Sequence, residues 1–195
     1  MNSKVEPFSL FTEYDIFLFK AGTHFKLYEK MGSHKVEKDG IVGVYFAVWA
    51  PNAKKVSVIG DFNKWDSSEH PLLYRWDDSG IWEGFIEGLG FDDIYKYGIQ
   101  TYSGAYLEKG DPYALKWQQT TQAASVIATT FYEWKDQDWM QNRYQKNSLE
   151  SPMSVYEVHL ASWMRGTDNP DKFFSYREIA ERLVPYVKEM NFTHV

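Results

Sequence analysis

Six short apolar runs, separated by turn residues, occupy the chain from residue 41 to residue 131. They read IVGVYFAVW, KVSVIG, PLLYRW, IWEGFIEGL, IYKYGIQTY and AASVIATTF. Short strands with turn signals at intervals of roughly 8 to 12 residues are typical of an antiparallel sandwich. No helical period competes over this span. We therefore predict a mainly β fold built on an immunoglobulin-like antiparallel β-sandwich.

The first run shows the strand period most clearly. Val42, Val44, Phe46 and Val48 fall on one side of an extended chain, and the residues between them fall on the other. A period of two is expected of a strand. The DDSG sequence at 77–80 then predicts a hairpin between the third and fourth runs.

A different pattern begins after residue 134. The segment 136–147 predicts a short helix, and MSVYEVHLASW at 153–163 predicts a strand rich in β-branched and aromatic residues. Ser175 and Glu178 match a capping box, so a helix is expected to begin there. FTHV at 192–195 begins a second strand.

The second helix has an apolar face that can be read directly. Ile179, Leu183, Val187 and Met190 recur at helical spacing, with Pro185 inside the helix. A strand, a helix and a second strand form the start of a βαβ unit. Because a parallel sheet needs further strands beside it, we expect this segment to be the truncated opening of a (β/α)₈ barrel, and the chain to be a fragment.

These patterns divide the chain into four parts. We expect an N-terminal lead with a short helix at 1–35, the sandwich at 36–133, a helix and linker at 134–151, and the barrel start at 152–195.

Composition excludes several classes of protein. The net charge is −6 and the basic residues are scattered, which argues against a nucleic-acid partner. The chain has no cysteine, which is typical of a reducing compartment. No apolar run approaches the ~20 residues that span a membrane, and the N-terminus lacks a signal-peptide pattern. We expect a cytoplasmic protein with no membrane partner.

The turn VIGDFNKWD at 58–66 places Trp65 among polar residues, where a large apolar side chain is not expected. A large apolar ring in water is costly unless something covers it. An uncharged sugar offers an apolar C–H face to an aromatic ring and a hydroxyl edge to polar side chains. Trp65, Lys96, Asn63 and Tyr106 are therefore candidate carbohydrate-binding residues.

Each of these residues also has a structural interpretation. Aromatic rings on strands usually belong to the core, and we favour that place for Trp49, Trp82 and Tyr97. Lys96 could be a solvated charge on the outer face of a sheet. Asn63 is an ordinary turn residue. The alternative to a sugar site is thus a scaffold in which Trp65 packs against another part of the protein.

VIGDFNKWD, IYKYGI and KGDPYA together resemble the glycogen-binding module attached to α-amylase-superfamily enzymes. PMSVYEVHLASW and YREIAERLVPYVKEMNFTHV resemble the first barrel elements of the 1,4-α-glucan (glycogen) branching enzymes, and GTHFKLYEKMGSH resembles that family's entry to the module. Ala161 and Asn191 stand where this family usually has glycine. The family resemblance covers nearly the whole chain from about residue 20.

The resemblance implies an activity for a longer protein. That family cuts an α-1,4 glucan and rejoins the cut end through an α-1,6 bond, with two carboxyl groups that lie on later barrel strands. The resemblance therefore implies no catalytic residue here and glycogen or a linear α-1,4-glucan as partner. A debranching hydrolase of the same superfamily is the alternative enzyme.

The remaining polar candidates carry no chemistry in this interpretation. Glu157 and His159 alternate on the expected barrel strand, and we assign them structural roles. No third ligand accompanies them, so we expect no metal site and no cofactor. His24, His34 and His70 are isolated and are expected at the surface.

Overall fold

The computed structural model of the 195-residue chain describes residues 4–119, 123–166, 171 and 173–195. The chain divides into two compact units, Met1–Tyr132 and Glu133–Val195. Among the described residues, no helix combines the length and the apolar character needed to cross a membrane.

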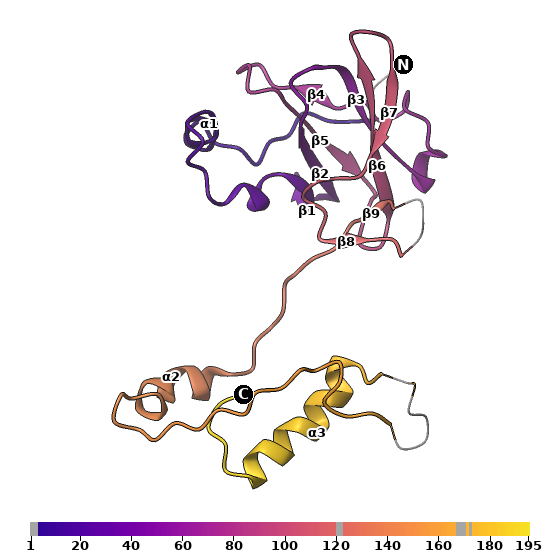
Figure 1. Cartoon of the computed structure of the whole chain (residues 1–195). Helices are drawn as coiled ribbons and strands as arrows, with labels where there is room; N and C mark the ends of the chain where they lie inside the picture. Colours follow the sequence, from indigo (N-terminus) through magenta and orange to yellow (C-terminus); the bar gives the residue numbers. More distant parts are fainter. Residues whose placement is uncertain (1–3, 120–122, 167–170, 172) are drawn as a thin grey trace. The chain divides into compact units, whose positions relative to one another are not determined.

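The first unit consists of two antiparallel sheets (Figure 1). In the sheet here called sheet A, the order is β1 (Gly32–Lys38), β2 (Ile41–Trp49), β5 (Ile81–Glu87), β4 (Leu73–Tyr74). In sheet B, the order is β3 (Ala53–Gly60), β6 (Ile94–Thr101), β9 (Ser125–Val126), β8 (Lys116–Trp117), and β7 (Tyr106–Lys109) also pairs with β6. Two antiparallel sheets bear out the mainly β prediction and agree with a sandwich.

Alternation along β2 places its side chains in two different cores. Val44, Phe46 and Val48 belong to the main cluster with residues of β3, β5 and β6, as the period of two predicts. Tyr45 and Ala47, on the opposite face, are also fully buried, because they belong to a second cluster with the N-terminal lead. The lead thus covers the outer face of sheet A.

The lead is ordered by a helix and its cap. Helix α1 (Glu13–Lys20) begins after Thr12, whose hydroxyl accepts a hydrogen bond from the Asp15 backbone N–H. The Asp15 carboxylate accepts in return from the Thr12 backbone N–H, at 2.8 Å. Ile16 and Phe11 then bury their side chains in the cluster beneath. A short 3₁₀ turn, η1 (Leu27–Glu29), leads into β1.

Several expectations about the first unit need correction. The third run forms only the two residues of β4, although the predicted hairpin to β5 is present, with the Arg75 N–H donating to the Ile81 carbonyl. Strands β1, β7 and β8 were not predicted. Trp82 and Tyr97 are buried as expected, but Trp49 is 57% exposed. Its indole N–H donates to the Ser79 carbonyl at 3.0 Å.

The second unit contains helices α2 (Gln137–Lys146) and α3 (Tyr176–Glu189), both predicted from the sequence. Ser175 and Glu178 form the expected capping box, and Asn191 adopts the left-handed conformation at φ 60°. Helix α3 buries its apolar face, formed by Ile179, Leu183 and Val187, at about 2 kcal/mol per side chain.

The expected strand at 153–163 is the main difference in this unit. Val155 and His194 form a parallel bridge, and the described part of residues 152–195 contains no longer strand. The chain turns at His159, whose carbonyl accepts from the Trp163 N–H. A parallel strand is stabilised by neighbours on both sides, and here a single residue pair bridges. Met190 is also 54% exposed rather than part of the helix core.

Candidate functional site

The outer face of sheet B is set by the register of β3 and β6. Ile59 pairs with Lys96, and Val58 pairs with Tyr97. Because successive side chains point to opposite faces, burial of Tyr95 and Tyr97 in the main core places Lys96 on the outer face. Lys96 is half-buried there, and its Nζ lies 6.0 Å from the centroid of the Trp65 ring.

Trp65 lies in the loop that follows β3, after the 3₁₀ turn η2 (Asp61–Asn63). Its backbone is left-handed, with φ 61°, as is that of Lys64, with φ 56°. A bulky residue holds this conformation only where its surroundings enforce it. The Trp65 N–H donates to the Gly60 carbonyl at 2.9 Å, and the indole Nε1 donates to Asp61 Oδ1 at 2.8 Å. The half-buried ring therefore has a fixed orientation.

Asn63 holds this loop from inside. Asn63 is buried, at 7% exposure, so it does not present its amide to solvent as expected of a sugar-binding side chain. Its Oδ1 accepts from the Gly60 N–H at 3.0 Å, and its Nδ2 donates to the Val58 carbonyl at 3.0 Å and to His70 Nδ1 at 2.9 Å. We therefore interpret Asn63 as a residue that positions Trp65.

The three histidines expected at the surface are not free surface groups. His70 is 6% exposed. Burial, followed by the nearby Lys4, lowers the pKa of His70, while Glu69 acts in the opposite direction. The His24 side chain is also buried, with Nε2 2.9 Å from an Asp15 carboxylate oxygen, and His34 Nε2 bonds the Met31 carbonyl at 2.9 Å.

Tyr106 lies on β7 and is 47% exposed. Its hydroxyl rests above Gly98 of β6, where a Cβ atom would lie 2.5 Å from the Tyr106 oxygen. Tyr106 lines a cleft of about 160 Å³ together with Lys55, Ser57, Ser67, Gly98 and Gln100. The structure thus brings Trp65 and Lys96 together and places Tyr106 at an adjoining cleft that includes Ser67, two residues after Trp65.

A buried carboxylate beneath this face was missed from the sequence. Asp111 is fully buried, and its Oδ2 accepts from the hydroxyls of Tyr95 at 2.6 Å and Tyr97 at 2.9 Å. Burial raises the pKa of Asp111, although the Tyr95 and Tyr97 hydrogen bonds act against that rise. The only signal was the Asp-Pro pair after β7, a common turn sequence. The network fixes the strand that carries Lys96.

Glu157 and His159 lie in the second unit and are both exposed. His159 Nδ1 is 2.9 Å from the Ser162 hydroxyl, a local contact in the turn. Across the described ranges, no three His, Cys, Asp or Glu side chains gather closely enough to hold a metal ion.

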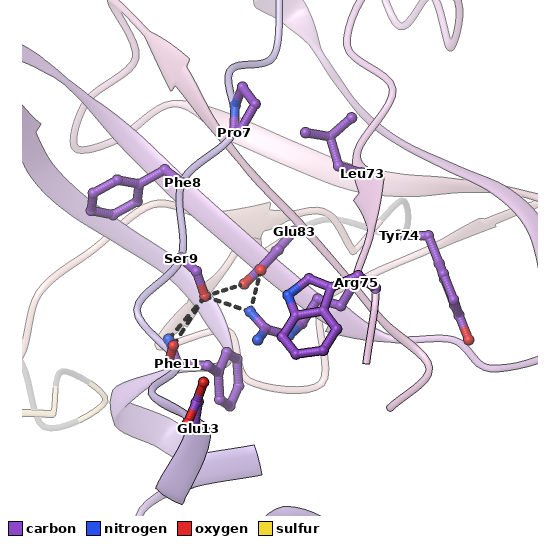
Figure 2. Close-up of a pocket in the computed structure, with 10 residues that line it drawn as sticks. Pro7, Phe8, Ser9, Phe11, Glu13, Leu73, Tyr74, Arg75 and Glu83 are labelled. Carbon is purple, nitrogen blue, oxygen red and sulfur yellow. Dashed lines mark hydrogen bonds and ion pairs between the residues drawn. The ribbon is translucent and has the colours of Figure 1, made fainter. Parts of the chain in front are cut away.

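A larger hollow, of about 550 Å³, lies between the lead and the β4–β5 hairpin (Figure 2). Arg75 and Glu83 form an ion pair at its floor, and the Ser9 hydroxyl joins both side chains. This network attaches the lead to sheet A. No local sequence pattern indicates this network, because its members are separated by up to 74 residues.

Part of the chain is similar to a known carbohydrate-binding module, and most of it is similar to known enzymes. Residues 30–114 match carbohydrate-binding module 48, described as the isoamylase N-terminal domain. The chain is 48% identical over 192 residues to the 1,4-alpha-glucan branching enzyme GlgB of Aquifex aeolicus (strain VF5). The alignment covers 98% of this chain and 30% of that enzyme.

The chain matches the N-terminal part of the 1,4-α-glucan branching enzymes. GlgB of Gloeobacter violaceus (strain ATCC 29082 / PCC 7421) is 45% identical over 188 residues, with 96% of this chain and 26% of that enzyme covered. The resemblance to branching enzymes seen in the sequence is therefore confirmed. The chain spans less than a third of the length of these relatives.

Solved structures support the fold alone. The product complex of the multi-modular glycogen-degrading pneumococcal virulence factor SpuA aligns with a TM-score of 0.53, 18% identity, and coverage of 84% of this chain and 18% of that one. The GBS pullulanase SAP in complex with maltotetraose aligns with a TM-score of 0.51, 16% identity, and coverage of 84% and 23%. The far higher identity to branching enzymes disfavours the debranching alternative.

Proposed function

We propose that this chain supplies the glucan-binding module of a longer 1,4-α-glucan branching enzyme, and that the module holds the glucan on the outer face of sheet B. The observation that carries the proposal is the contact between Trp65 and Lys96, which come from two segments and meet on a partly exposed surface. The module match and the identity to branching enzymes support the ligand class.

The geometry suits a neutral sugar chain. The indole of Trp65 is held by Asp61, so its face can cover the C–H face of a glucose unit without further ordering of the ring. Lys96 supplies three N–H donors beside that ring for the hydroxyl edge. Tyr106, at the adjoining cleft, provides a second ring for a neighbouring unit. Asn63 contributes by fixing the loop rather than by touching sugar.

The chemistry of the longer protein belongs to parts that this chain does not contain. Cutting and rejoining with retention requires a carboxylate nucleophile and a second carboxyl group that acts as acid and then base. We propose that these lie on later strands of a (β/α)₈ barrel whose first elements are residues 152–195. We expect the 195-residue chain alone to have no transferase activity, and we place the longer protein in the cytoplasm.

Migration in a native gel containing glycogen tests the binding site. We expect glycogen to retard the 195-residue chain and Trp65→Ala to lose most of that retardation. Trp139→Ala is the matched control, because this half-exposed tryptophan lies on α2 in the other unit. Equal retardation of the wild type and Trp65→Ala would count against the assigned face.

A scaffold role is the second candidate function, and the partial burial of Trp65 favours it. The indole N–H already donates to Asp61 within the same loop. The indole therefore needs no sugar to satisfy its hydrogen-bond donor. In that case the module would stabilise the barrel without binding glucan. Wild-type chain that migrates equally with and without glycogen would support this role.

A further inference from the structure

The hollow between the lead and the β4–β5 hairpin has a buried polar floor (Figure 2). Arg75 and Glu83 are each 8% exposed and face each other as an ion pair. The Ser9 hydroxyl accepts from Arg75 Nη1 at 2.6 Å and donates to Glu83 Oε2 at 2.9 Å. The floor therefore presents fixed donors and acceptors at the bottom of an open space.

The charge at this floor is net negative. Arg75 also pairs with Asp77 at 2.9 Å, and Glu83 accepts from the Tyr45 hydroxyl. Two carboxylates thus surround one guanidinium, and Glu13 lies at the rim. This excess of negative charge disfavours an anionic ligand such as a phosphate. The carboxylates are already engaged by hydrogen bonds, which also disfavours a cation. The chemistry fits a neutral ligand rich in hydroxyl groups.

The walls of the hollow are apolar and aromatic. Trp76, on the hairpin, is 82% exposed, and Tyr74 is 44% exposed. Phe11 lies under the guanidinium of Arg75, 5.6 Å from its central carbon. An indole so far exposed is costly in water unless a ligand or a partner covers it. A space of about 550 Å³ falls within the usual range for small-molecule sites.

We propose that this hollow is a second α-glucan site, on sheet A, with Trp76 as the ring that covers a glucose unit and the Ser9–Arg75–Glu83 floor facing its hydroxyls. Its residues are separate from Trp65, Lys96 and Tyr106. The choice of an α-glucan as ligand rests on the proposed function. The site itself rests on different residues. Two sites on one module would raise affinity for a branched polymer through multivalency.

The test uses the full 195-residue chain in two assays, a native gel with glycogen and a fluorescence titration with maltoheptaose. Trp76→Ala removes an exposed ring without touching the core. We expect it to weaken glycogen binding about two- to tenfold, Trp76→Phe to restore most of the loss, and Trp65→Ala with Trp76→Ala to remove the remainder. Phe25→Ala is the control, because Phe25 is 89% exposed and does not line the hollow.

The outcomes separate the two sites. If Trp76→Ala weakens binding while Trp65→Ala does not, the inference stands and the site at Trp65 and Lys96 fails. If Trp65→Ala alone weakens binding, the inference is overturned. It is also overturned if Trp76→Ala and Phe25→Ala bind both glucans as the wild type does, because Trp76 would then make no contact with glucan.

Discussion

Lys96 on β6 and Trp65 in the loop after β3 meet on the outer face of sheet B, with the ammonium 6.0 Å from the centre of the indole ring. That distance is at the outer limit of a cation–π contact, so the pair contributes little to stability. The N–H donors of Lys96 instead lie beside the face of the Trp65 ring. We therefore expect Lys96 to affect glucan affinity rather than folding.

Lys96→Met keeps the length of the side chain and removes its donors. We expect the affinity for maltoheptaose to fall about two- to tenfold, because a ligand hydroxyl loses its partner, while the denaturation midpoint stays close to that of the wild type. Isothermal titration and urea denaturation measure the two quantities. Lys54→Met, an exposed lysine on β3, serves as the control. Unchanged affinity would remove Lys96 from the site.

Asn63→Ala is expected to lower the free energy of unfolding by about 3 kcal/mol. The reason is that three hydrogen bonds are lost and the buried Gly60 N–H is left without its acceptor. Glucan affinity is expected to fall as well, because the loop no longer holds the left-handed backbone of Trp65. Asn52→Ala, at an exposed turn, should change the unfolding free energy by less than about 0.5 kcal/mol.

The pH dependence of stability is predicted from His70. Because the folded state lowers the pKa of His70 through burial and Lys4, protonation favours the unfolded chain. Stability is therefore full above the unfolded pKa of about 6.5 and is lost as the pH falls below that value. Thermal denaturation between pH 7.5 and pH 5 measures the decline. His70→Gln should flatten it, and an unaltered slope in that variant would assign the decline to other groups.

Gly98→Ala tests whether the position of Tyr106 matters. The added methyl group would lie 2.5 Å from the Tyr106 hydroxyl and so must displace the ring. We expect glucan affinity to fall about threefold, within the range of an aromatic contact. In a Tyr106→Ala background the same change should have no further effect. An equal loss in both backgrounds would show that Gly98 acts through something other than Tyr106.

Much of the architecture could be predicted because it depends on local patterns. Alternation at residues 42–48, the DDSG hairpin and the capping box of Ser175 with Glu178 each specify structure within a few residues. Strand β1 was missed because its GSHKVEK sequence is polar, and it is held by pairing with β2 rather than by its own propensity. The segment 153–163 has the composition of a strand but forms only one bridge, between Val155 and His194. An apolar segment forms a ladder only where neighbouring strands pair with it.

The candidate site shows the same division. Trp65 and Lys96 could be selected because Trp65 lies among the polar residues of a turn and Lys96 lies between two tyrosines of a predicted strand. The burial of Asn63 and His70 could not be predicted, since it depends on the fold of the loop back onto β3. The floor of Ser9, Arg75 and Glu83 joins residues from distant segments, and no local pattern indicates it.

Indole N–H resonances provide the most direct measurement of the central claim, that the outer face of sheet B holds glucan. Each of the eight tryptophans has one indole N–H, and Trp65→Phe identifies the signal from Trp65. In a titration with maltoheptaose, we predict a saturable shift of the Trp65 signal. In Lys96→Met, the same shift is expected to saturate at a higher maltoheptaose concentration, because the affinity is lower. A Trp65 signal that stays unmoved while glycogen still retards the chain would contradict the claim.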